Sequence, residues 1–399
     1  MADNKQNTNP NVPNSGNIPK LRFPEFSEDW VQYNCSDLLE FYSTNSLSWE
    51  QLGYENNELL NLHYGLIHVG LPTLVKIKQN NLPSIKPEFQ PKNYTLCKNG
   101  DVAFADASED TNEVAKPIEF YDCSDKQIVC GLHTIHGRDK LNATEVGFKG
   151  YAFSSTPFHH KIRRLAQGSK IYSISSKNFA EVTLGVPTKK EQRKIVDLLS
   201  KLDERIATQN KIIEQLQSLI KGIRVRLFSF DNYDIKYLGD LCSITTGKLD
   251  ANAMVENGKY PFFTCAEDTF RIDEYAFDTE ALLISGNGAN LGYIHYYNGK
   301  FNAYQRTYVL DKFSVEVMYL KYYLETFLNQ RINQEVNVGN TPYIVLSTLT
   351  KMKIKIPDIS QQRNIINVLS NLNLKLNQEK DILSAYQTQK AYLLRNLFI

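Results

Sequence analysis

Cysteine and histidine are scarce in this sequence, and their spacing argues against a zinc-binding protein. The 399 residues include six cysteines and seven histidines. No two cysteines have the Cys-x-x-Cys spacing of zinc ligands, and the adjacent pair His159 and His160 has no further candidate ligands nearby. We therefore expect no metal site, and we expect the cysteines to be reduced, structural thiols of a cytoplasmic protein.

Long apolar runs are also missing. No stretch approaches the roughly 20 apolar residues that a membrane-spanning helix needs, so no membrane role is expected. Residues 1–20 are polar, rich in Asn and Pro, and lack the apolar core of a signal peptide. We expect residues 1–20 to be a disordered tail and the protein to be cytoplasmic.

The sequence has little net charge, with a formal value of +1 that by itself gives no sign of nucleic-acid binding. The distribution of charge is more informative. Residues 188–228 have a net charge of +5, whereas residues 21–187 and 229–356 have net charges of −4 and −3. Within the first acidic segment, residues 138–177 hold eight basic side chains and two acidic ones. The charge is therefore patchy rather than uniformly basic.

A long internal repeat is the strongest feature that the sequence does contain. Residues 186–228 and 356–398 align without gaps and share 11 identical residues in 43 positions. Identity at this level in an ungapped window indicates duplication. The first copy also has the pattern of a capping box, with Thr188 followed three residues later by Glu191, and the second copy has a weaker version.

Both copies of the repeat predict a long amphipathic helix whose apolar positions step by four and three. A helix of about 40 residues extends about 60 Å and is not stable alone in water. Because a globular segment lies between the copies, we expect the two helices to pair as an antiparallel coiled coil, with the polar residues Gln209 and Glu379 at equivalent positions. The predicted apolar core positions are Ile195, Leu199, Leu202, Ile206, Ile213, Leu216, Ile365, Leu369, Leu372, Leu376 and Leu383.

The segments that precede the two helices also resemble each other. The stretches "VQYNCSDLLEF" and "IKYLGDLCSI" share a motif, and each globular segment ends in a strand-like run before a proline. Strand-like stretches at residues 128–135, 281–285 and 304–310 alternate with a helical one at residues 317–330, which predicts α+β domains.

The expected fold class is therefore α+β, with two pseudo-symmetric globular domains separated by a long antiparallel two-helix coiled coil. The predicted segments are the tail 1–20, a first globular domain 21–187, a first spacer helix 188–228, a second globular domain 229–356 and a second spacer helix 357–399.

The sequence resembles the specificity (S) subunits of bacterial type I restriction-modification systems over nearly its whole length. The resemblance rests on "KLRFPEFSEDW" at residues 20–30, on the openings "VPTKKEQRKI" and "IPDISQQRNI" of the two helices, and on their ends "LIKGIRVRLF" and "AYLLRNLF". The chain departs from the family pattern at Gln361, where Glu is common; Glu191 retains it in the first copy.

This resemblance implies that each globular segment is a target-recognition domain that reads one half of a bipartite double-stranded DNA site, while the coiled coil sets the spacing. It implies two methyltransferase (M) subunits and restriction (R) subunits as partners. S-adenosylmethionine, ATP and Mg would belong to those partners, with no catalytic residue and no cofactor in this chain. A single-chain DNA adenine methyltransferase or nuclease, and a non-catalytic protein scaffold, are the alternatives.

DNA base recognition favours Arg or Lys opposite guanine and Asn or Gln opposite adenine. The stretch "GLHTIHGRDK" at residues 131–140, the basic run after it and "NAYQRTYVL" at residues 302–310 offer such side chains. For each of them a plain solvent-exposed position is the alternative. The predicted DNA-binding residues are His133, His136, Arg138, Lys140, Arg163, Arg164, Lys170, Lys248, Asn287, Asn290, Gln305, Arg306 and Asn340.

Two stretches imitate a methyltransferase. "ISGNGANLG" at residues 284–292 resembles a nucleotide-binding loop, but the strand-like "YIHYYNGKF" follows it where such a loop requires a helix. A hairpin turn is the preferred interpretation, with its Asn side chains free to contact DNA. "NTPY" at residues 340–343 differs from the Asn-Pro-Pro-Tyr motif of adenine methyltransferases at Thr341, and we expect no catalysis there.

Overall fold

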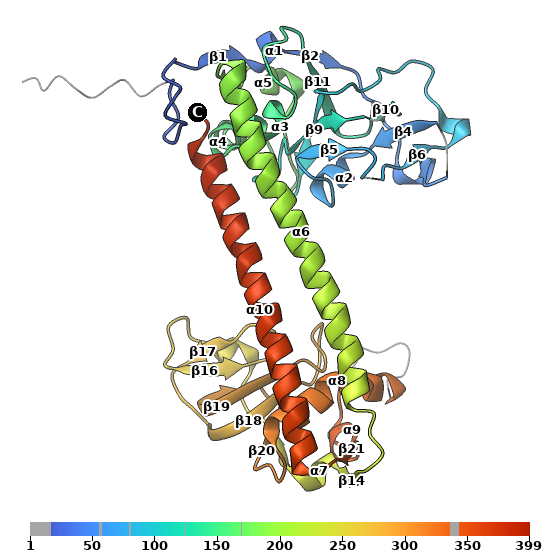
Figure 1. Ribbon diagram of the computed structural model, residues 1–399, viewed down its shortest axis with the longest axis vertical. Coiled ribbons are helices and arrows are strands. Elements are labelled where there is room, and N and C mark those ends of the chain that lie inside the picture. The colour runs from blue at the N-terminus through green and yellow to red at the C-terminus, as the bar shows by residue number, and fades with distance from the viewer. Residues whose placement is uncertain (1–16, 56–57, 80, 124, 169, 336–342) are drawn as a thin grey trace, which may run out of the picture. The chain divides into compact units, whose positions relative to one another are not determined.

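The computed structural model describes residues 17–55, 58–79, 81–123, 125–168, 170–335 and 343–399, which form two compact units (Figure 1). The first unit comprises the chain up to Gln209 together with Ile382–Ile399, and the second comprises Asn210–Asp381. None of the helices in the described part of the chain combines the length and the apolarity that crossing a membrane requires.

Two sheets form the framework of the first unit. Its described strands build a five-stranded sheet with the order β2 (Leu39–Tyr42), β11 (Thr134–Asp139), β7 (Val102–Ala105), β9 (Pro117–Asp122) and β5 (Leu74–Lys76). A second sheet has the order β10 (Gln127–Cys130), β4 (Leu59–Leu62), β6 (Ser84–Ile85) and β3 (Leu52–Gly53). All four residues of β7 are buried, which explains their uninterrupted apolar run Val-Ala-Phe-Ala.

Short helices cover the first sheet with an aromatic core. Phe104 of β7 packs edge-on against Phe153, and Phe158 and Phe179 complete the cluster. The remaining short elements are α1 (Cys35–Leu38), α2 (Tyr64–His68), α3 (Phe148–Phe153), α4 (Thr156–Arg163), α5 (Ser176–Ala180), η1 (Trp49–Gln51), η2 (Pro87–Phe89), β8 (Ala107–Ser108) and β12 (Tyr172–Ser173).

One larger sheet forms the framework of the second unit. Its described strands have the order β15 (Ser243–Thr246), β20 (Thr307–Asp311), β18 (Phe277–Ser285), β19 (Ile294–Ala303), β16 (Tyr260–Phe263) and β17 (Phe270–Ile272). Helix α8 (Val317–Glu335) contributes Leu320 and Leu324 to the same core as Leu282 and Ile284 of β18. Shorter elements are α7 (Leu238–Leu241), η3 (Ala251–Ala253) and α9 (Leu346–Thr350).

The same strand pair precedes the long helix in each unit. In the first unit β1 (Val31–Asn34) pairs antiparallel with β13 (Thr183–Val186), and in the second β14 (Asp234–Tyr237) pairs antiparallel with β21 (Lys353–Ile356). A four-residue helix follows the first strand of each pair, α1 in one case and α7 in the other. These are the stretches whose sequences resemble each other, so the internal repeat is a structural repeat.

The long helices are α6 (Lys189–Leu227) and α10 (Ile359–Asn396). In the first unit, Leu199 near the start of α6 shares a core with Leu393 near the end of α10. In the second unit, Leu227 at the end of α6 packs against the core that contains Ile365 near the start of α10. Opposite ends meet in both units, which confirms the predicted antiparallel pairing (Figure 1).

The structure buries or half-buries every predicted core position of the two helices. Those with 8% exposure or less are Ile195, Leu199, Leu202, Ile213, Ile365 and Leu369. The half-buried ones are Ile206, Leu216, Leu372, Leu376 and Leu383. The equivalent polar residues Gln209 and Glu379 are each 7% exposed.

The start of α6 differs from its prediction. Glu191 does not close a capping box with Thr188, because its carboxylate accepts hydrogen bonds from Arg22 Nε and Nη2 at 2.8 Å each and from the Trp30 indole at 3.4 Å. The equivalent start of α10 is capped instead by Asp358, whose Oδ1 accepts from the Gln361 backbone N–H at 2.9 Å. The motif at residues 20–30 therefore anchors the first long helix.

Of two further elements predicted in the globular domains, the structure contradicts one and confirms the other. The single strand expected at residues 128–135 is wrong, because the chain turns between β10 and β11 and His133 takes a φ of 53° there. The hairpin expected at residues 284–292 is confirmed, since β18 and β19 pair antiparallel with Ile284 opposite Ile294.

Candidate nucleic-acid interface

The predicted basic loop at residues 131–140 is divided by strand β11 into an exposed start, a buried middle and an exposed end. His133 precedes β11 and Lys140 follows it, and a six-residue strand spans about 20 Å. The Lys140 ammonium donates to the Ser36 carbonyl at 2.6 Å, beside α1. These two residues therefore cannot belong to one compact contact surface.

The prediction that His136 binds DNA is wrong. Its side chain is fully buried, and its Nε2 lies 2.8 Å from the Asp101 carboxylate. Arg138 belongs to the same network, with Nε and Nη2 at 2.8 and 2.7 Å from the Asp101 oxygens and its guanidinium over the Tyr42 ring. Burial opposes ionisation of Asp101, but the hydrogen bonds from Arg138 and His136 prevail and lower its pKa. The burial of His136 excludes it from direct contact with DNA, whereas Arg138 is half-buried and its guanidinium is engaged by Asp101.

Three other predicted residues gather around the loop at residues 106–113. His133 is half exposed, with Nδ1 3.1 Å from an Asp106 oxygen. Arg163 at the end of α4 donates to the Asn112 side chain at 2.8 Å. Lys170 is exposed in the turn before β12, which pairs with β8 of the same loop. Arg164 is also exposed at the end of α4. The first unit thus offers one surface with imidazole, guanidinium and ammonium groups.

An aromatic row beside His133 escaped prediction from the sequence. The rings of Trp49 and His63 lie 4.4 Å apart, those of His63 and Tyr64 4.7 Å apart, and those of Tyr64 and His133 5.2 Å apart. Trp49 is 47% exposed, so the row ends at the surface. In the sequence, only a tryptophan followed at a distance by "LHYG" indicates this aromatic row. The indication is weak, because the row is assembled from separate segments.

The second unit brings four predicted residues together where strands end. The backbone N–H of Gln305 donates to the Leu249 carbonyl at 2.8 Å, which places Gln305 beside the segment of Lys248. The Gly286 N–H donates to the Arg306 carbonyl at 2.9 Å, which places Arg306 beside Asn287. Lys248, Gln305 and Arg306 are exposed and Asn287 is half-buried.

Two glycines make this close approach possible. A Cβ atom on Gly247 would lie 1.9 Å from the Ala303 carbonyl oxygen, and one on Gly286 would lie 2.4 Å from the Arg306 oxygen. Real Cβ atoms do not approach backbone so closely, so these turns require glycine. The cluster offers a lysine, an arginine and two carboxamides, the side chains that read guanine and adenine.

Asn290 belongs to a neighbouring groove of about 500 Å³ in the second unit. Arg224 and Lys321 line this groove and both pair with Glu325, and Glu267 also lines it, so the groove holds two basic and two acidic side chains. The remaining predicted residue, Asn340, lies outside the described residues, as does most of the "NTPY" stretch.

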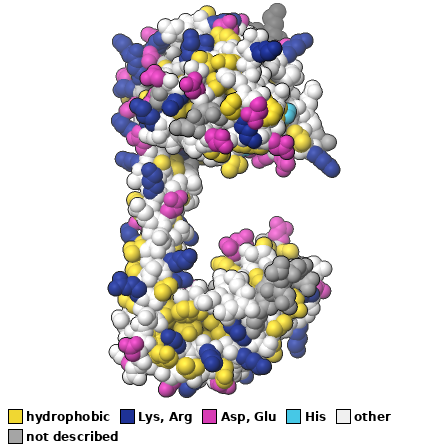
Figure 2. Space-filling view, turned by 90° about the vertical axis from the view of Figure 1, so that its right-hand side faces the viewer, with side chains coloured by type: hydrophobic (Ala, Val, Ile, Leu, Met, Phe, Trp, Pro, Cys, Tyr) yellow, Lys and Arg dark blue, Asp and Glu magenta, His cyan; other side chains and the backbone are white. Residues whose placement is uncertain are grey.

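Neither unit presents a continuous basic face in the view of Figure 2. Lys and Arg side chains on that face are interspersed with Asp and Glu. Ion pairs also offset basic side chains at the start of α6, where Arg193 pairs with Glu145 and Lys194 with Glu25. On this face the basic side chains are therefore not gathered into one patch.

Comparison with known protein families shows which family this chain belongs to. The model of the type I restriction modification DNA specificity domain matches residues 125–218 and 231–384, more than half of the chain. The chain belongs to this family. Both matched segments contain candidate residues of the two surfaces, Arg163 and Lys170 in one and Lys248 and Arg306 in the other.

Individual proteins of similar sequence are also named as type I specificity subunits. The type I restriction enzyme EcoDI specificity subunit of Escherichia coli is 40% identical over 143 residues, which is 36% of this chain and 32% of that subunit. A putative type I specificity subunit of Mycoplasma genitalium is 25% identical over 296 residues, which is 69% of this chain and 76% of the relative.

A solved structure shares the fold of this DNA specificity protein. The S subunit of a type I restriction-modification system from M. genitalium superposes with a TM-score of 0.59 at 20% identity, covering 96% of this chain and 99% of that one. At this identity the likeness concerns the fold alone.

Proposed function

We propose that this chain is the DNA sequence-specificity subunit of a type I restriction-modification complex and that each unit reads one half of a bipartite target. The observation that carries the proposal is the duplication of a strand pair and a long helix, each joined to its own globular domain, within a DNA specificity family. A protein with two related readers suits a target with two half-sites, because the spacing of half-sites mirrors protein geometry.

The proposed subunit carries no catalytic centre and depends on partners. Two methyltransferase subunits would dock on it, restriction subunits would join them, and these partners would hold S-adenosylmethionine, ATP and Mg. The net charges of −4 for residues 21–187 and −3 for residues 229–356 support this dependence, since DNA affinity comes largely from phosphate neutralisation. We place the complex in the cytoplasm, with no membrane role.

Exchanging the first globular domain tests the two-reader assignment. Replacing residues 21–185 with the equivalent segment of another specificity subunit should change one half of the methylated sequence in cells and leave the other half intact. If both halves change together, each unit does not read its own half-site.

A pair of substitutions in the second unit tests the proposed surface more finely. Arg306→Ala should relax the requirement at one position of one half-site by about 1–3 kcal/mol. Lys300→Ala is the matched control, because Lys300 is an exposed cation of the same unit outside the cluster. Mapping methylated adenines genome-wide reads out both variants. Equal effects of the two substitutions would remove the cluster from the proposed interface.

Binding measurements separate this role from the two alternatives. The isolated chain should bind DNA weakly, with strong dependence on salt, and should bind tightly only with methyltransferase subunits present. Tight binding of S-adenosylmethionine by the isolated chain would favour a single-chain methyltransferase. Absence of any sequence preference in the assembled complex would favour a plain scaffold.

The helices are proposed to set the distance between the half-sites. Inserting four residues after Gln209 lengthens α6 by about 6 Å. The nonspecific gap in the target should then grow by up to about two base pairs at 3.4 Å each, while both half-site sequences stay the same. An unchanged gap in a complex that still methylates would show that the helices do not determine the spacing.

A further inference from the structure

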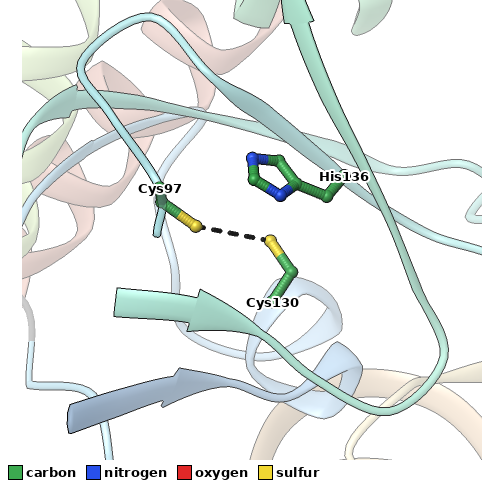
Figure 3. A group of neighbouring side chains, drawn as sticks. All are labelled: Cys97, Cys130 and His136. Carbon is green, nitrogen blue, oxygen red and sulfur yellow. Dashed lines mark hydrogen bonds between the residues drawn. The ribbon is translucent and has the colours of Figure 1, made fainter. Parts of the chain in front are cut away.

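Three side chains from distant parts of the sequence meet inside the first unit. Cys97, Cys130 and His136 point toward one another, and the two sulfur atoms lie 3.6 Å apart (Figure 3). One potential ligand atom from each residue lies within 4.8 Å of the other two. Their exposures are 5%, 3% and 0%, so the group is closed off from solvent.

The imidazole of His136 is held in an orientation that leaves one nitrogen unused. Its Nε2 contacts the Asp101 carboxylate at 2.8 Å and is therefore the donor, because an ionised carboxylate only accepts. Its Nδ1 is buried and has no hydrogen-bond partner in the described part of the chain. An unsatisfied buried nitrogen costs about 1–3 kcal/mol, so an acceptor lone pair in this position needs an explanation.

We propose that Cys97, Cys130 and His136 bind a zinc ion that stabilises the first unit. Two thiolates and an imidazole are the ligand types that zinc prefers, although most structural sites add a fourth protein ligand, and a carboxylate on the far ring nitrogen is the usual support of a zinc-bound histidine. Two sulfur ligands of one tetrahedral zinc, each about 2.3 Å from the metal, lie about 3.8 Å apart. The observed separation of 3.6 Å needs almost no adjustment.

The fourth position of the tetrahedron would take a water molecule, because Cys123 is not among the residues whose ligand atoms lie together. The Cys123 thiol contacts the Cys97 carbonyl at 3.9 Å and is 8% exposed. Binding would release the protons of the thiols, because zinc binds thiolates. A disulfide between Cys97 and Cys130 is the main competing state, but it requires the sulfurs to close to about 2.05 Å.

The position of the group explains what the metal would do. Cys130 lies on β10 of one sheet, His136 on β11 of the other, and the Cys97 backbone N–H donates to the Ile128 carbonyl at 2.8 Å. A zinc ion would therefore connect both sheets and fix the turn that carries His133. This role is structural and does not depend on the proposed DNA specificity.

Metal analysis of the full-length chain, purified without chelators, tests the proposal directly. We expect about one zinc ion per chain, as for other structural sites. Refolding with Co²⁺ in place of zinc should produce the intense absorption of tetrahedral cobalt with thiolate ligands. Less than about one tenth of this zinc content, with no cobalt spectrum, would overturn the proposal. Recovery of a Cys97–Cys130 disulfide by peptide mass spectrometry in place of the metal would also overturn it.

Variants localise the metal. Cys97→Ser and Cys130→Ser should each lose bound zinc, whereas Cys242→Ser, which changes a buried cysteine of the second unit, should keep it. Asp101→Asn should weaken zinc affinity by about 10–100-fold in a chelator competition. Arg138→Gln removes another partner of Asp101 and leaves the ligands in place, so it should keep zinc affinity. Zinc retained by both Cys97→Ser and Cys130→Ser would place the ion elsewhere.

Discussion

The starts of the two long helices arose from one duplicated sequence but are stabilised in different ways. Glu191 of α6 is 1% exposed and bound by Arg22 and Trp30 of the preceding segment. Gln361 of α10 is half-buried, and Asp358 caps its helix locally. The first start therefore depends on a distant segment of the chain, and the second depends on its own cap.

A second pair of equivalent residues shows what both copies retain. Gln192 and Gln362 each donate a side-chain hydrogen bond to the carbonyl of the proline five residues before, at 2.8 and 2.9 Å. Gln192 also bonds the Ala143 carbonyl and the Glu145 N–H, whereas Gln362 Oε1 has no partner among the described residues. The shared bond holds strand to helix, and the first copy adds contacts to its globular domain.

The largest expected effect comes from a substitution that removes the anchor at the start of α6. Glu191→Ala leaves Arg22, which is 10% exposed, as an unpaired buried charge and should cost about 3–5 kcal/mol of the unfolding free energy of the first unit. Gln361→Ala at the equivalent position should cost less than about 0.5 kcal/mol. Urea unfolding followed by tryptophan fluorescence reports on the first unit, because Trp30 and Trp49 are the two tryptophans of the chain.

A matched substitution checks the source of this effect. Lys201→Ala removes an exposed ion pair with Asp197 on the same helix and should change stability by less than about 1 kcal/mol. Similar losses for Glu191→Ala and Lys201→Ala would contradict the anchoring role of the buried pair.

Acid should destabilise the first unit through His159. Burial lowers the pKa of His159 to about 4; Glu113 opposes this shift, while Arg163, Lys116 and His160 add to it. The unfolded chain, with an ordinary histidine pKa near 6.5, binds a proton first as pH falls, so stability is lost between about pH 6.5 and 4. At pH 5 this loss should reach about 2 kcal/mol relative to pH 7.

Removing the titrating group sharpens the acid test. In His159→Leu the difference in tryptophan-monitored unfolding free energy between pH 7 and pH 5 should shrink by about 2 kcal/mol. His160→Leu changes the exposed neighbour on the same helix, which contributes less to the pKa shift than burial does, and should alter the difference much less. An unaltered pH dependence in His159→Leu would mean that this histidine is not held neutral.

The smallest expected effect is the difference in stability loss between substitutions of Gln192 and Gln362. Gln192→Ala removes three hydrogen bonds and Gln362→Ala removes one. The first change should therefore cost roughly 1 kcal/mol more than the second, because several polar groups lose buried partners. Hydrogen exchange of peptides from the starts of α6 and α10 measures each junction separately. Equal losses of protection would show that the extra bonds of Gln192 contribute nothing net.

Much of the fold follows from local sequence patterns. The apolar steps from Ile195 to Leu202 and from Ile365 to Leu372 predict two helices with apolar stripes, and the intervening domain predicts their antiparallel pairing. The turn at residues 284–292 is equally local, since glycines between apolar runs favour a hairpin. Patterns of this kind can be recognised along the chain without knowing which segments pack against it. The sequence by itself therefore determined these elements.

Only the tertiary structure decided which polar side chains are available. His136 and Arg138 carry DNA-reading chemistry in the sequence, but His136 is fully buried and both side chains are bound to Asp101. Cys97 and Cys130 are 33 residues apart and show no zinc spacing, yet adjoining sheets bring their sulfurs together. Burial and proximity depend on which distant segments pack side by side, and a pattern read along one segment contains no information about its neighbours in space.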